Sequence, residues 1–340
     1  MALSSERSNT DRNTHHQQAQ KDRLSCVFHR ATSIAKEGRS AKNGGNGVAA
    51  EPRCQPPLYL QEAMPELPEV ETVANGVHER IHGQTVRSVW TSNKPQTFKS
   101  PPDEIVEVVT GSRVDRVHRV GKTIVIDLTR SGDHAKEPAQ FLVHLGMTGR
   151  LLVSTPDTPI PPHTHAVLTL SGGKELRFVD ARRFGRLSVV AAGGHETRYE
   201  GPGSEPLTIG LEEFIALFRN RKTPIKAALL NQSLLHGVGN IYADESLFHA
   251  GIRPSRHAGR LTRAELTRLR ASLKKVLTEA IQLGGSSVSD YVDADGVAGF
   301  FQLHHHAYGR TGQPCRVCST LIKRIVIGGR STHFCPTCQH

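Results

Sequence analysis

Four cysteines near the C-terminal end of the sequence have the spacing of a metal site. Cys315 and Cys318 form one CxxC pair, Cys335 and Cys338 form another, and 16 residues separate the two pairs. Each pair lets two thiolates converge on one tetrahedral Zn²⁺ from a tight turn, and four thiolates leave no position open for water or substrate. The pattern therefore predicts one structural zinc ion in a zinc ribbon. Disulfide bonds are the alternative, which a chain without a secretion signal disfavours.

The run "MPELPEVET", Met64–Thr72, is a second stretch of unusual composition, with two prolines among carboxylates. Pro68 stands where the first turn of a helix tolerates proline, and apolar residues recur at helical spacing from Val70 to Ile81. We therefore expect a helix almost directly after Met64. Residues 1–63 are rich in Ser, Asn, Gln, Gly and charge and lack a sustained apolar period, so we expect them to be disordered.

Length and charge narrow the class of protein. The 340 residues are enough for two domains of ordinary size, each with its own core. The 43 Lys+Arg against 32 Asp+Glu give a net charge of +11, which favours a polyanionic partner such as nucleic acid; a solvated basic surface without a partner is the alternative. No apolar run approaches the roughly 18 residues that a membrane span needs, and no signal peptide is present, so the sequence predicts a soluble, unsecreted protein.

The elements that position these groups fall into two kinds. After the first helix come short runs rich in Val, Ile and Leu, which predict the strands of a β-sandwich or barrel. These runs are "KTIVIDLT", "FLVHLGM", "RLLVS", "HAVLTL", "ELRFVD" and "RLSVV", with "SGGK" as a tight turn. Beyond the Gly- and Pro-rich "GGHETRYEGPGSEP" the period becomes helical, and the longest helix is expected to begin with a capping box of Thr262 and Glu265 and to end at Gly284–Gly285.

Several motifs together carry a resemblance to a known family. In order they are "MPELPEVET", "HLGMTGR", "DARRFG", "GVGNIYADESLF", "YGRTGQPCRVC" and "STHFCPTC". The sequence from 64 to 340 resembles the formamidopyrimidine-DNA glycosylases, bacterial enzymes that excise oxidised purines. The related endonuclease VIII-like glycosylases share the architecture, but "PELPEVE" is more similar to the purine-directed branch.

The resemblance implies an α+β multidomain fold: an N-terminal helix plus β-sandwich domain, a helix-two-turns-helix domain and a C-terminal zinc ribbon. The expected divisions are a disordered extension at 1–64, the catalytic β-sandwich domain at 65–192, a linker at 193–206, the helical DNA-binding domain at 207–300 and the ribbon at 301–340.

The resemblance also implies the chemistry. Pro65 would be the nucleophile: its secondary amine attacks C1′ of the sugar, displaces the base and holds the ring-opened sugar as a Schiff base. An α-amino group, with a reference pKa of about 7.7 to 8.0, is better placed for this than a lysine at about 10.4, whereas a proline amide has no free lone pair. We therefore expect the functional chain to begin at Pro65, with residues 1–64 absent or removed. Glu66 would be the general acid/base, although a carboxylate favoured by the helix dipole is the alternative.

Further residues are implied to act on DNA. Lys122 would neutralise a phosphate beside the lesion, and Arg330 of the ribbon would meet the backbone; we group both with the catalytic residues. Met147, Arg182 and Phe184 match an intercalation set, in which an apolar wedge unstacks the bases while the arginine addresses the orphaned cytosine. Burial of Met147 and Phe184 in a core is the alternative.

Four more DNA-contacting positions are implied by the resemblance: His144, Lys226, Asn240 and Tyr308. Asn240 lies in "HGVGN", whose glycines would let backbone N–H groups approach a phosphate at the next helix start; a helix cap is its alternative role. The histidine run His304–His306 is compatible with a second metal site, but consecutive residues of a strand point to opposite faces, so we expect a solvated run.

The function implied is that of a bifunctional DNA glycosylase and abasic-site lyase, which removes 8-oxoguanine and formamidopyrimidines and cuts the strand by β,δ-elimination. The expected partner is double-stranded DNA with oxidised purines or abasic sites, and the expected cofactor is one structural Zn²⁺. The protein is expected to be a cytoplasmic, nucleoid-associated monomer. Two alternatives remain: a non-catalytic damaged-DNA-binding protein with Pro65 blocked by the extension, and an oxidised-pyrimidine glycosylase.

Overall fold

The computed structural model describes residues 64–130, 137–191, 198–287 and 292–340. The disorder expected for residues 1–63 lies outside this part of the chain. Within it, no helix combines the length and the apolar character that a membrane span requires.

The first described helix, α2 (Leu67–Ile81), begins where the sequence predicts it. The backbone N–H of Glu66 donates to a carboxylate oxygen of Glu69 at 2.9 Å, which satisfies a group that the first turn leaves without a helical partner. The apolar residues at helical spacing form one buried stripe, from Val70 to Ile81. This stripe packs on the strands Arg113–Val120, Thr123–Thr129 and Gly149–Ser154, so α2 is fixed against the sheets immediately after Pro65.

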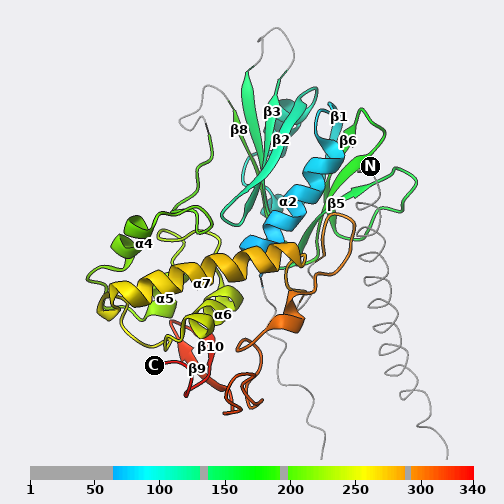
Figure 1. The fold of residues 1–340 in the computed structure, drawn as a ribbon. Coiled ribbons are helices and arrows are strands. Elements are labelled where there is room, and N and C mark those ends of the chain that lie inside the picture. Colours follow the sequence, from blue (N-terminus) through cyan, green and yellow to red (C-terminus); the bar gives the residue numbers. More distant parts are fainter. Residues whose placement is uncertain (1–63, 131–136, 192–197, 288–291) are drawn as a thin grey trace, which may run out of the picture. The chain divides into compact units, whose positions relative to one another are not determined.

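Two four-stranded antiparallel sheets confirm the predicted sandwich (Figure 1). One has the order β1-β6-β7-β5 and the other β2-β3-β4-β8, and buried apolar side chains of both form a single core. The strands are β1 (Val86–Thr91), β2 (Arg113–Val120), β3 (Thr123–Thr129), β4 (Pro138–His144), β5 (Gly149–Ser154), β6 (Thr164–Leu170), β7 (Glu175–Asp180) and β8 (Arg186–Ala191). A 3-10 helix at Pro95–Thr97 and helix α3 (Pro102–Val109) lie between β1 and β2 in sequence.

Two loops cross between the sheets at the same edge. The loop 145–148 joins β4 to β5, and the loop 181–185 joins β7 to β8. Because β4 pairs with β8 in one sheet and β5 pairs with β7 in the other, the two loops begin and end on paired strands and lie side by side. These are the loops that carry the expected intercalation set.

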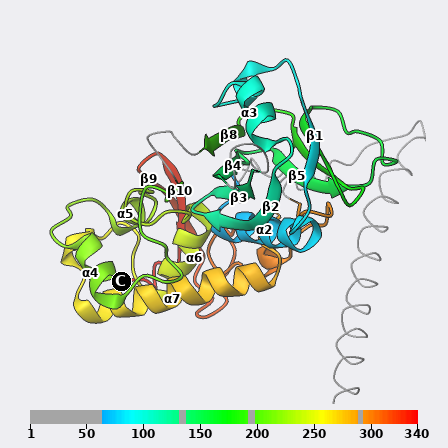
Figure 2. The same ribbon diagram turned by 90° about the horizontal axis from the view of Figure 1, so that it is seen from above.

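The helices follow the sandwich in sequence, as predicted, and α7 also contacts α2 (Figure 2). They are α4 (Leu211–Phe218), α5 (Ile225–Leu229), α6 (Asn240–Ala250), a 3-10 helix at Ala258–Arg260 and α7 (Arg263–Gln282). The expected capping box of α7 is present, since the Thr262 hydroxyl accepts from the backbone N–H of Glu265 and the Glu265 carboxylate accepts from that of Thr262.

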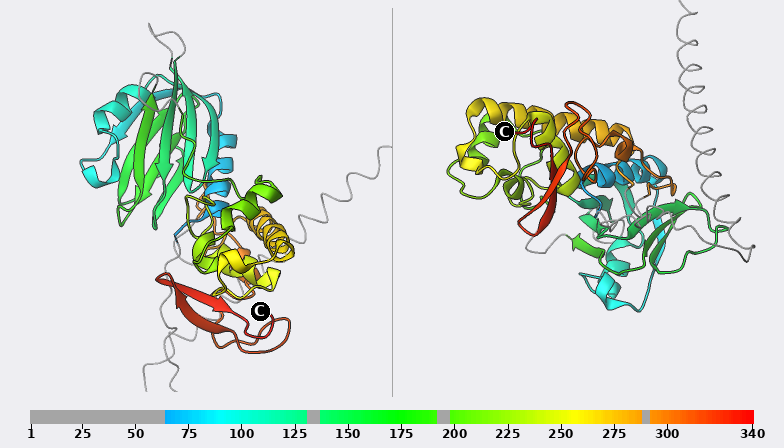
Figure 3. Two further views of the ribbon diagram at one scale, coloured as in Figure 1. Left: turned by 90° about the vertical axis from the view of Figure 1, so that its left-hand side faces the viewer. Right: turned by 90° about the horizontal axis from the view of Figure 1, so that it is seen from below.

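A two-stranded hairpin, β9 (Lys323–Ile327) and β10 (Arg330–Phe334), forms the C-terminal ribbon and lies beside the helices (Figure 3). Its turn is Gly328–Gly329, with φ of 57° and 75°, values that glycine adopts without a steric penalty. Asp244 of α6 accepts from the backbone N–H of His333 at 2.9 Å, so the ribbon is fixed directly to the helix that follows "HGVGN".

The expectation of a solvated histidine strand is wrong. Residues Phe301–His304 form a 3-10 helix, and His305 is only 6% exposed. Its Nε2 lies 3.2 Å from the hydroxyl oxygen of Ser286. The alternation that strands impose does not apply because no strand forms there, and each of the three histidines has a different environment.

Candidate active site and DNA interface

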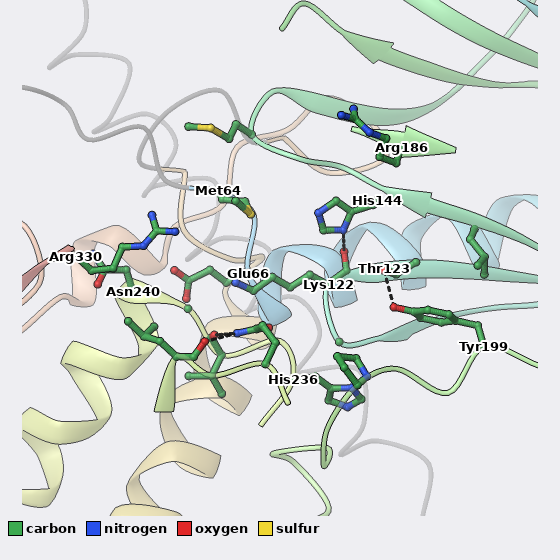
Figure 4. A pocket seen from close by; sticks show the side chains of 18 of the residues that line it. Met64, Glu66, Lys122, Thr123, His144, Arg186, Tyr199, His236, Asn240 and Arg330 are labelled. Atoms are coloured by element: carbon green, nitrogen blue, oxygen red, sulfur yellow. Dashed lines mark hydrogen bonds between the residues drawn. The ribbon is translucent and has the colours of Figure 1, made fainter. Parts of the chain in front are cut away.

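A cavity of about 980 Å³ gathers most of the residues that the sequence singles out. Its lining comes from the chain around Glu66, the turn between β2 and β3, the paired strands β4 and β8, the loop 145–148, the start of α6 and the ribbon hairpin. The expected site residues among the lining are Glu66, Lys122, His144, Met147, Asn240, Tyr308 and Arg330. Figure 4 shows that Glu66 and Lys122 lie beside each other in it.

Glu66 is held by the N-terminus of α6. Its carboxylate accepts hydrogen bonds from the backbone N–H groups of Ile241 at 3.1 Å and Tyr242 at 3.4 Å. A Cβ atom on Gly239 would lie 2.2 Å from the Glu66 carboxyl carbon, so only glycine leaves room for this approach. The expectation that these N–H groups meet a phosphate is therefore corrected: at Ile241 and Tyr242 they bind the protein's own carboxyl group.

Burial makes this carboxyl group weakly acidic. Glu66 is 3% exposed, and its burial raises the pKa to about 7, against the lowering influence of the Lys122 ammonium. A second buried carboxyl group, that of Glu69, also has a raised pKa because of burial. Glu69 accepts from the Tyr242 hydroxyl and, at 2.7 Å, from the backbone N–H of Ser286. A group with a pKa near neutrality can both donate and accept protons under physiological conditions.

Lys122 occupies the turn between β2 and β3, directly after Gly121, whose φ is 62°. Burial lowers the pKa of its ammonium, while the carboxylates of Glu66 and Glu69 oppose that effect. The ring Nδ1 of His144 lies 3.1 Å from the Lys122 carbonyl oxygen, so the end of β4 fixes the turn. Lys122 thus brings a positive charge to the part of the cavity where Glu66 lies.

Pro65 is buried between Met64 and Glu66, and both of these neighbours line the cavity. In the chain as given, the Pro65 nitrogen is an amide bonded to Met64. The backbone therefore places this nitrogen next to the cavity but leaves it without the lone pair that a nucleophile needs.

Asp180 organises both sheet-crossing loops. The buried carboxylate accepts from the Thr148 hydroxyl in one loop, and from the backbone N–H groups of Arg182 at 3.2 Å and Gly185 at 2.7 Å in the other. The Arg182 guanidinium carbon lies 4.9 Å from the centre of the Phe184 ring, a cation–π distance. Phe184 is 47% exposed, so the alternative of a core side chain does not hold for it.

The ribbon contributes to the same cavity. The Asn240 side-chain amide donates to the hydroxyl of Ser331 at 3.2 Å, next to the exposed Arg330. Asn240 is the first residue of α6, and Gly239 occupies the N-cap, so Asn240 is not the helix cap. Tyr308, 6% exposed, also lines the cavity.

Lys226 does not fit the expected role of a DNA contact. Its side chain is 0% exposed, its ammonium pairs with Asp244 at 2.7 Å, and it donates to the carbonyl oxygen of Ser331 at 2.6 Å. A buried ammonium that already has both partners cannot reach a phosphate without breaking them. Lys226 instead holds strand β10 against α6.

The four cysteine thiols cluster as the zinc prediction requires. Sulfur–sulfur distances are 3.9 Å for Cys315–Cys338 and 3.4 Å for both Cys318–Cys335 and Cys318–Cys338. Four sulfurs at 2.3 Å from a tetrahedral zinc ion stand about 3.8 Å apart, so the cluster matches the expected geometry. One structural Zn²⁺ held by these four residues is confirmed.

Three buried acids at the site were missed from the sequence: Glu69, Asp180 and Asp244. Each lies in a motif in which a neighbouring residue was assigned the role. Asp180, for example, stands two residues before Arg182 in "DARRFG". Glu69 and Asp244 have partners distant in sequence, 217 residues away for Glu69 and Ser286 and 89 residues away for Asp244 and His333. For Asp180, which ends the apolar strand run "ELRFVD", the available signal was an acid beside apolar residues, since buried acids need partners.

Comparisons with known proteins agree along the chain. The family profile of the formamidopyrimidine-DNA glycosylase N-terminal domain matches residues 64–187, that of its H2TH domain matches 201–292, and that of the zinc finger found in FPG and IleRS matches 312–340. A formamidopyrimidine-DNA glycosylase of Thioalkalivibrio sulfidiphilus is 42% identical over 279 residues, which are 81% of this chain and 100% of that protein.

Solved structures show the same similarity. A Lactococcus lactis FPG variant in complex with DNA that contains Fapy-dG superposes with a TM-score of 0.73 at 32% identity, covering 81% of this chain and 100% of that one. The Lactococcus lactis Fpg in complex with DNA that contains an abasic site gives a TM-score of 0.72 at 32% identity, covering 81% and 99%.

Proposed function

The chain belongs to the formamidopyrimidine-DNA glycosylase family, and on that premise we propose how its own residues carry out base excision. It is a DNA glycosylase and abasic-site lyase of base excision repair that acts on oxidised purines, and its partner is DNA that contains such lesions or abasic sites. The domain divisions at 65–192, 207–300 and 301–340 are part of the proposal, as is a location with the chromosomal DNA in the nucleoid.

The first proposed step is nucleophilic attack by the free imino nitrogen of Pro65. Its lone pair bonds to C1′, the bond between C1′ and the damaged base breaks with its electron pair on the base, and the base takes up the proton that the nitrogen loses. Glu66, with a pKa of about 7, then supplies the proton that lets the ring oxygen leave as a hydroxyl, which leaves a Schiff base between Pro65 and C1′. Loss of a C2′ proton expels the 3′ phosphate, and a second elimination expels the 5′ phosphate.

The other site residues are proposed to hold the DNA. Lys122 and Arg330 face the cavity with positive charge and neutralise phosphates beside the lesion. Met147 and Phe184 fill the space that the extruded base leaves, while Arg182 addresses the orphaned cytosine. Further contacts come from three residues that line the same cavity: His144, Asn240 and Tyr308.

The proposal rests on one observation above all: Glu66, buried beside Lys122, directly follows Pro65 at the cavity. Because an amide nitrogen cannot form a Schiff base, the functional chain begins at Pro65. Either translation starts at Met64 and that methionine is trimmed, or residues 1–64 are cut off. N-terminal sequencing and intact mass of the protein from its native host test this directly.

Borohydride trapping tests the chemistry. Two proteins are compared on 8-oxoguanine DNA, one that begins at Pro65 and one that keeps residues 1–64. We expect a covalent protein–DNA adduct only from the first. Trapping and full excision by the protein with the intact extension would refute the role of Pro65, and binding without an adduct from either protein would favour a non-catalytic damage-binding protein. Faster release of thymine glycol than of 8-oxoguanine would favour the oxidised-pyrimidine alternative.

A further inference from the structure

We propose that Glu245, His249 and His306 form a second metal site, separate from the four thiolates of the ribbon, that takes a divalent transition-metal ion such as Zn²⁺ or Co²⁺. Each residue offers one ligand atom, and these atoms lie within 4.8 Å of one another. Two imidazole nitrogens and one carboxylate oxygen are a donor set that such ions bind. The site lies outside the active-site cavity, since none of the three residues lines it.

Two separate segments bring the ligands together. Glu245 and His249 are four residues apart on α6, so their side chains share one face of the helix. His306 follows the 3-10 helix Phe301–His304 and lies over that face. Its Nδ1 is 3.8 Å from a carboxylate oxygen of Glu245, and its ring centre is 4.7 Å from that of His249 at an interplanar angle of 68°.

The backbone holds His306 in place independently of any ion. The Glu245 carboxylate accepts from the backbone N–H groups of His306 at 2.8 Å, Ala307 at 2.9 Å and Tyr308 at 2.7 Å. The His306 ring also stacks on Phe248, with ring centres 5.4 Å apart. A site whose ligands are already ordered loses less conformational entropy on binding than one that must assemble around the ion.

The side chains of His306 and Glu245 have lone pairs available to coordinate an ion. The His306 Nδ1 is buried and has no hydrogen-bond partner among the residues that the structure describes, because 3.8 Å is too long for one to Glu245. The Glu245 oxygen nearest to it accepts the backbone N–H of His306 and keeps a second lone pair. Burial lowers the pKa of both His249 and His306, which keeps their imidazoles neutral and able to coordinate.

Small movements complete the geometry. Ligands at 2.0–2.2 Å from a tetrahedral ion stand about 3.3 Å apart, so the 3.8 Å separation closes by about 0.5 Å. His249 lies on the exposed side of the cluster, where water would complete the coordination. Arg316 and Lys275 repel a cation there while Glu279 attracts it, so this site binds more weakly than the ribbon.

The histidine run provides its own control. His304 faces Glu279 at 3.4 Å, and His305 contacts Ser286, so neither belongs to the cluster. Replacing His304 removes an imidazole from the same run without touching the proposed ligands. A tract that binds metal only because it is rich in histidine would be weakened by that change as well.

The test uses untagged full-length protein whose ribbon is shown by metal analysis to hold one zinc ion. Titration with Co²⁺ is expected to fill one further site, giving ligand-field absorption without a thiolate-to-cobalt charge-transfer band. His249→Gln and His306→Gln are each expected to weaken this binding by about tenfold or more, while His304→Gln leaves it unchanged. His249 is exposed, so its replacement preserves the fold.

Three outcomes would overturn the proposal. One is the absence of an equivalent of bound Co²⁺ beside the ribbon zinc. Another is equal weakening by His304→Gln and His306→Gln, which would indicate nonspecific binding by the run. The third is growth of a thiolate charge-transfer band with release of zinc, which would show that Co²⁺ had entered the ribbon instead.

Discussion

The carboxylate of Glu66 accepts a hydrogen bond at 3.1 Å from the backbone N–H of Ile241, a residue 175 positions further along the chain. This contact joins the proposed nucleophile's neighbour to the first turn of α6. The same helix carries Asp244, which holds the ribbon strand. The proton transfer proposed for Glu66 and the attachment of the ribbon therefore depend on the position of one helix.

The raised pKa of Glu66 predicts a dependence of stability on pH. Between about pH 4.5 and pH 7 the unfolded chain releases this proton and the folded protein keeps it, so stability is lost as pH rises toward 7. A shift from 4.5 to about 7 corresponds to about 3 kcal/mol. In the wild type, the free energy of unfolding should therefore fall by this amount as pH rises. We expect Glu66→Gln to abolish this part of the pH dependence, measured by urea denaturation at pH 4 to 8. Glu104→Gln, at an exposed position of α3, should follow the wild type; identical pH profiles for both variants would contradict the assignment.

Gly239→Ala is expected to impair catalysis through Glu66. The new methyl group would lie 2.2 Å from the Glu66 carboxyl carbon, so the carboxyl group must move away from α6. We expect base excision to fall by about a hundredfold or more, the scale of removing a general acid/base, with binding to abasic-site DNA less affected. Gly210→Ala is the matched control, because a Cβ there meets nothing within 4 Å. Normal excision by Gly239→Ala would disprove the proposed role of this contact.

Arg182 and Arg183 allow a neighbouring-residue comparison. Arg182 stacks on Phe184, and the proposal assigns it to the orphaned cytosine. We expect Arg182→Ala to reduce the preference for cytosine opposite the lesion by about tenfold to a hundredfold, in line with 1–3 kcal/mol for a base-specific contact. Arg183→Ala should change it by less than about threefold. Excision rates on duplexes with each of the four opposite bases give the measurement, and a larger effect at Arg183 would reverse the assignment.

Lys226→Met is expected to destabilise the protein rather than to remove a phosphate contact. Loss of the ammonium leaves Asp244 buried without its partner, which costs about 3 kcal/mol or more of unfolding free energy. Lys222→Met, at an exposed position, should cost less than about 0.5 kcal/mol. A fully stable Lys226→Met variant would contradict this if the slope of its log DNA-binding constant against log salt concentration were smaller in magnitude by about one. Lys226 would then be a DNA contact.

Zinc removal is expected to abolish DNA binding while the sandwich stays folded. The ribbon's own apolar core is small, consisting of a few residues around Ile322 and Cys335, so the metal supplies much of its stability. Arg330 would then lose its fixed place at the cavity. Fluorescence anisotropy on lesion DNA and circular dichroism of a chelator-treated sample measure both effects, and added Zn²⁺ should restore binding. Unchanged affinity in the zinc-free protein would rule out this dependence.

Local patterns predicted most of the fold. The helix after Met64, the strands β3 to β8 and the capping box of Thr262 depend on residues close in sequence, and the structure confirms them, whereas β1 and β2 were not predicted. The zinc ligands were predictable because CxxC spacing itself fixes the geometry. The histidine run failed because its environment is set by Ser286 and Glu245, which lie outside the run.

The interior of the site could not be predicted in the same way. The motif that contains Glu66 predicted that this residue belongs to the site. It did not predict that backbone N–H groups of α6 bind its carboxylate. The sequence shows that Lys226 is charged, but not that Asp244 and the carbonyl oxygen of Ser331 bind its ammonium in the interior. Such contacts depend on which distant segments meet, and a single sequence contains no direct signal of that.

The Asp180 carboxylate ties the Met147 loop to the Arg182–Phe184 loop, and on the proposed function this link bears on how the protein searches DNA. A repair enzyme samples a vast number of undamaged base pairs for each lesion. Because folding already orders these two loops, their conformational entropy is lost once and not again at every base pair that is probed. The proposed intercalating side chains thus enter and leave the base stack from loops that are already ordered. Most of the free energy needed to probe a base pair is then spent on distorting the DNA, which is where damaged and intact pairs differ.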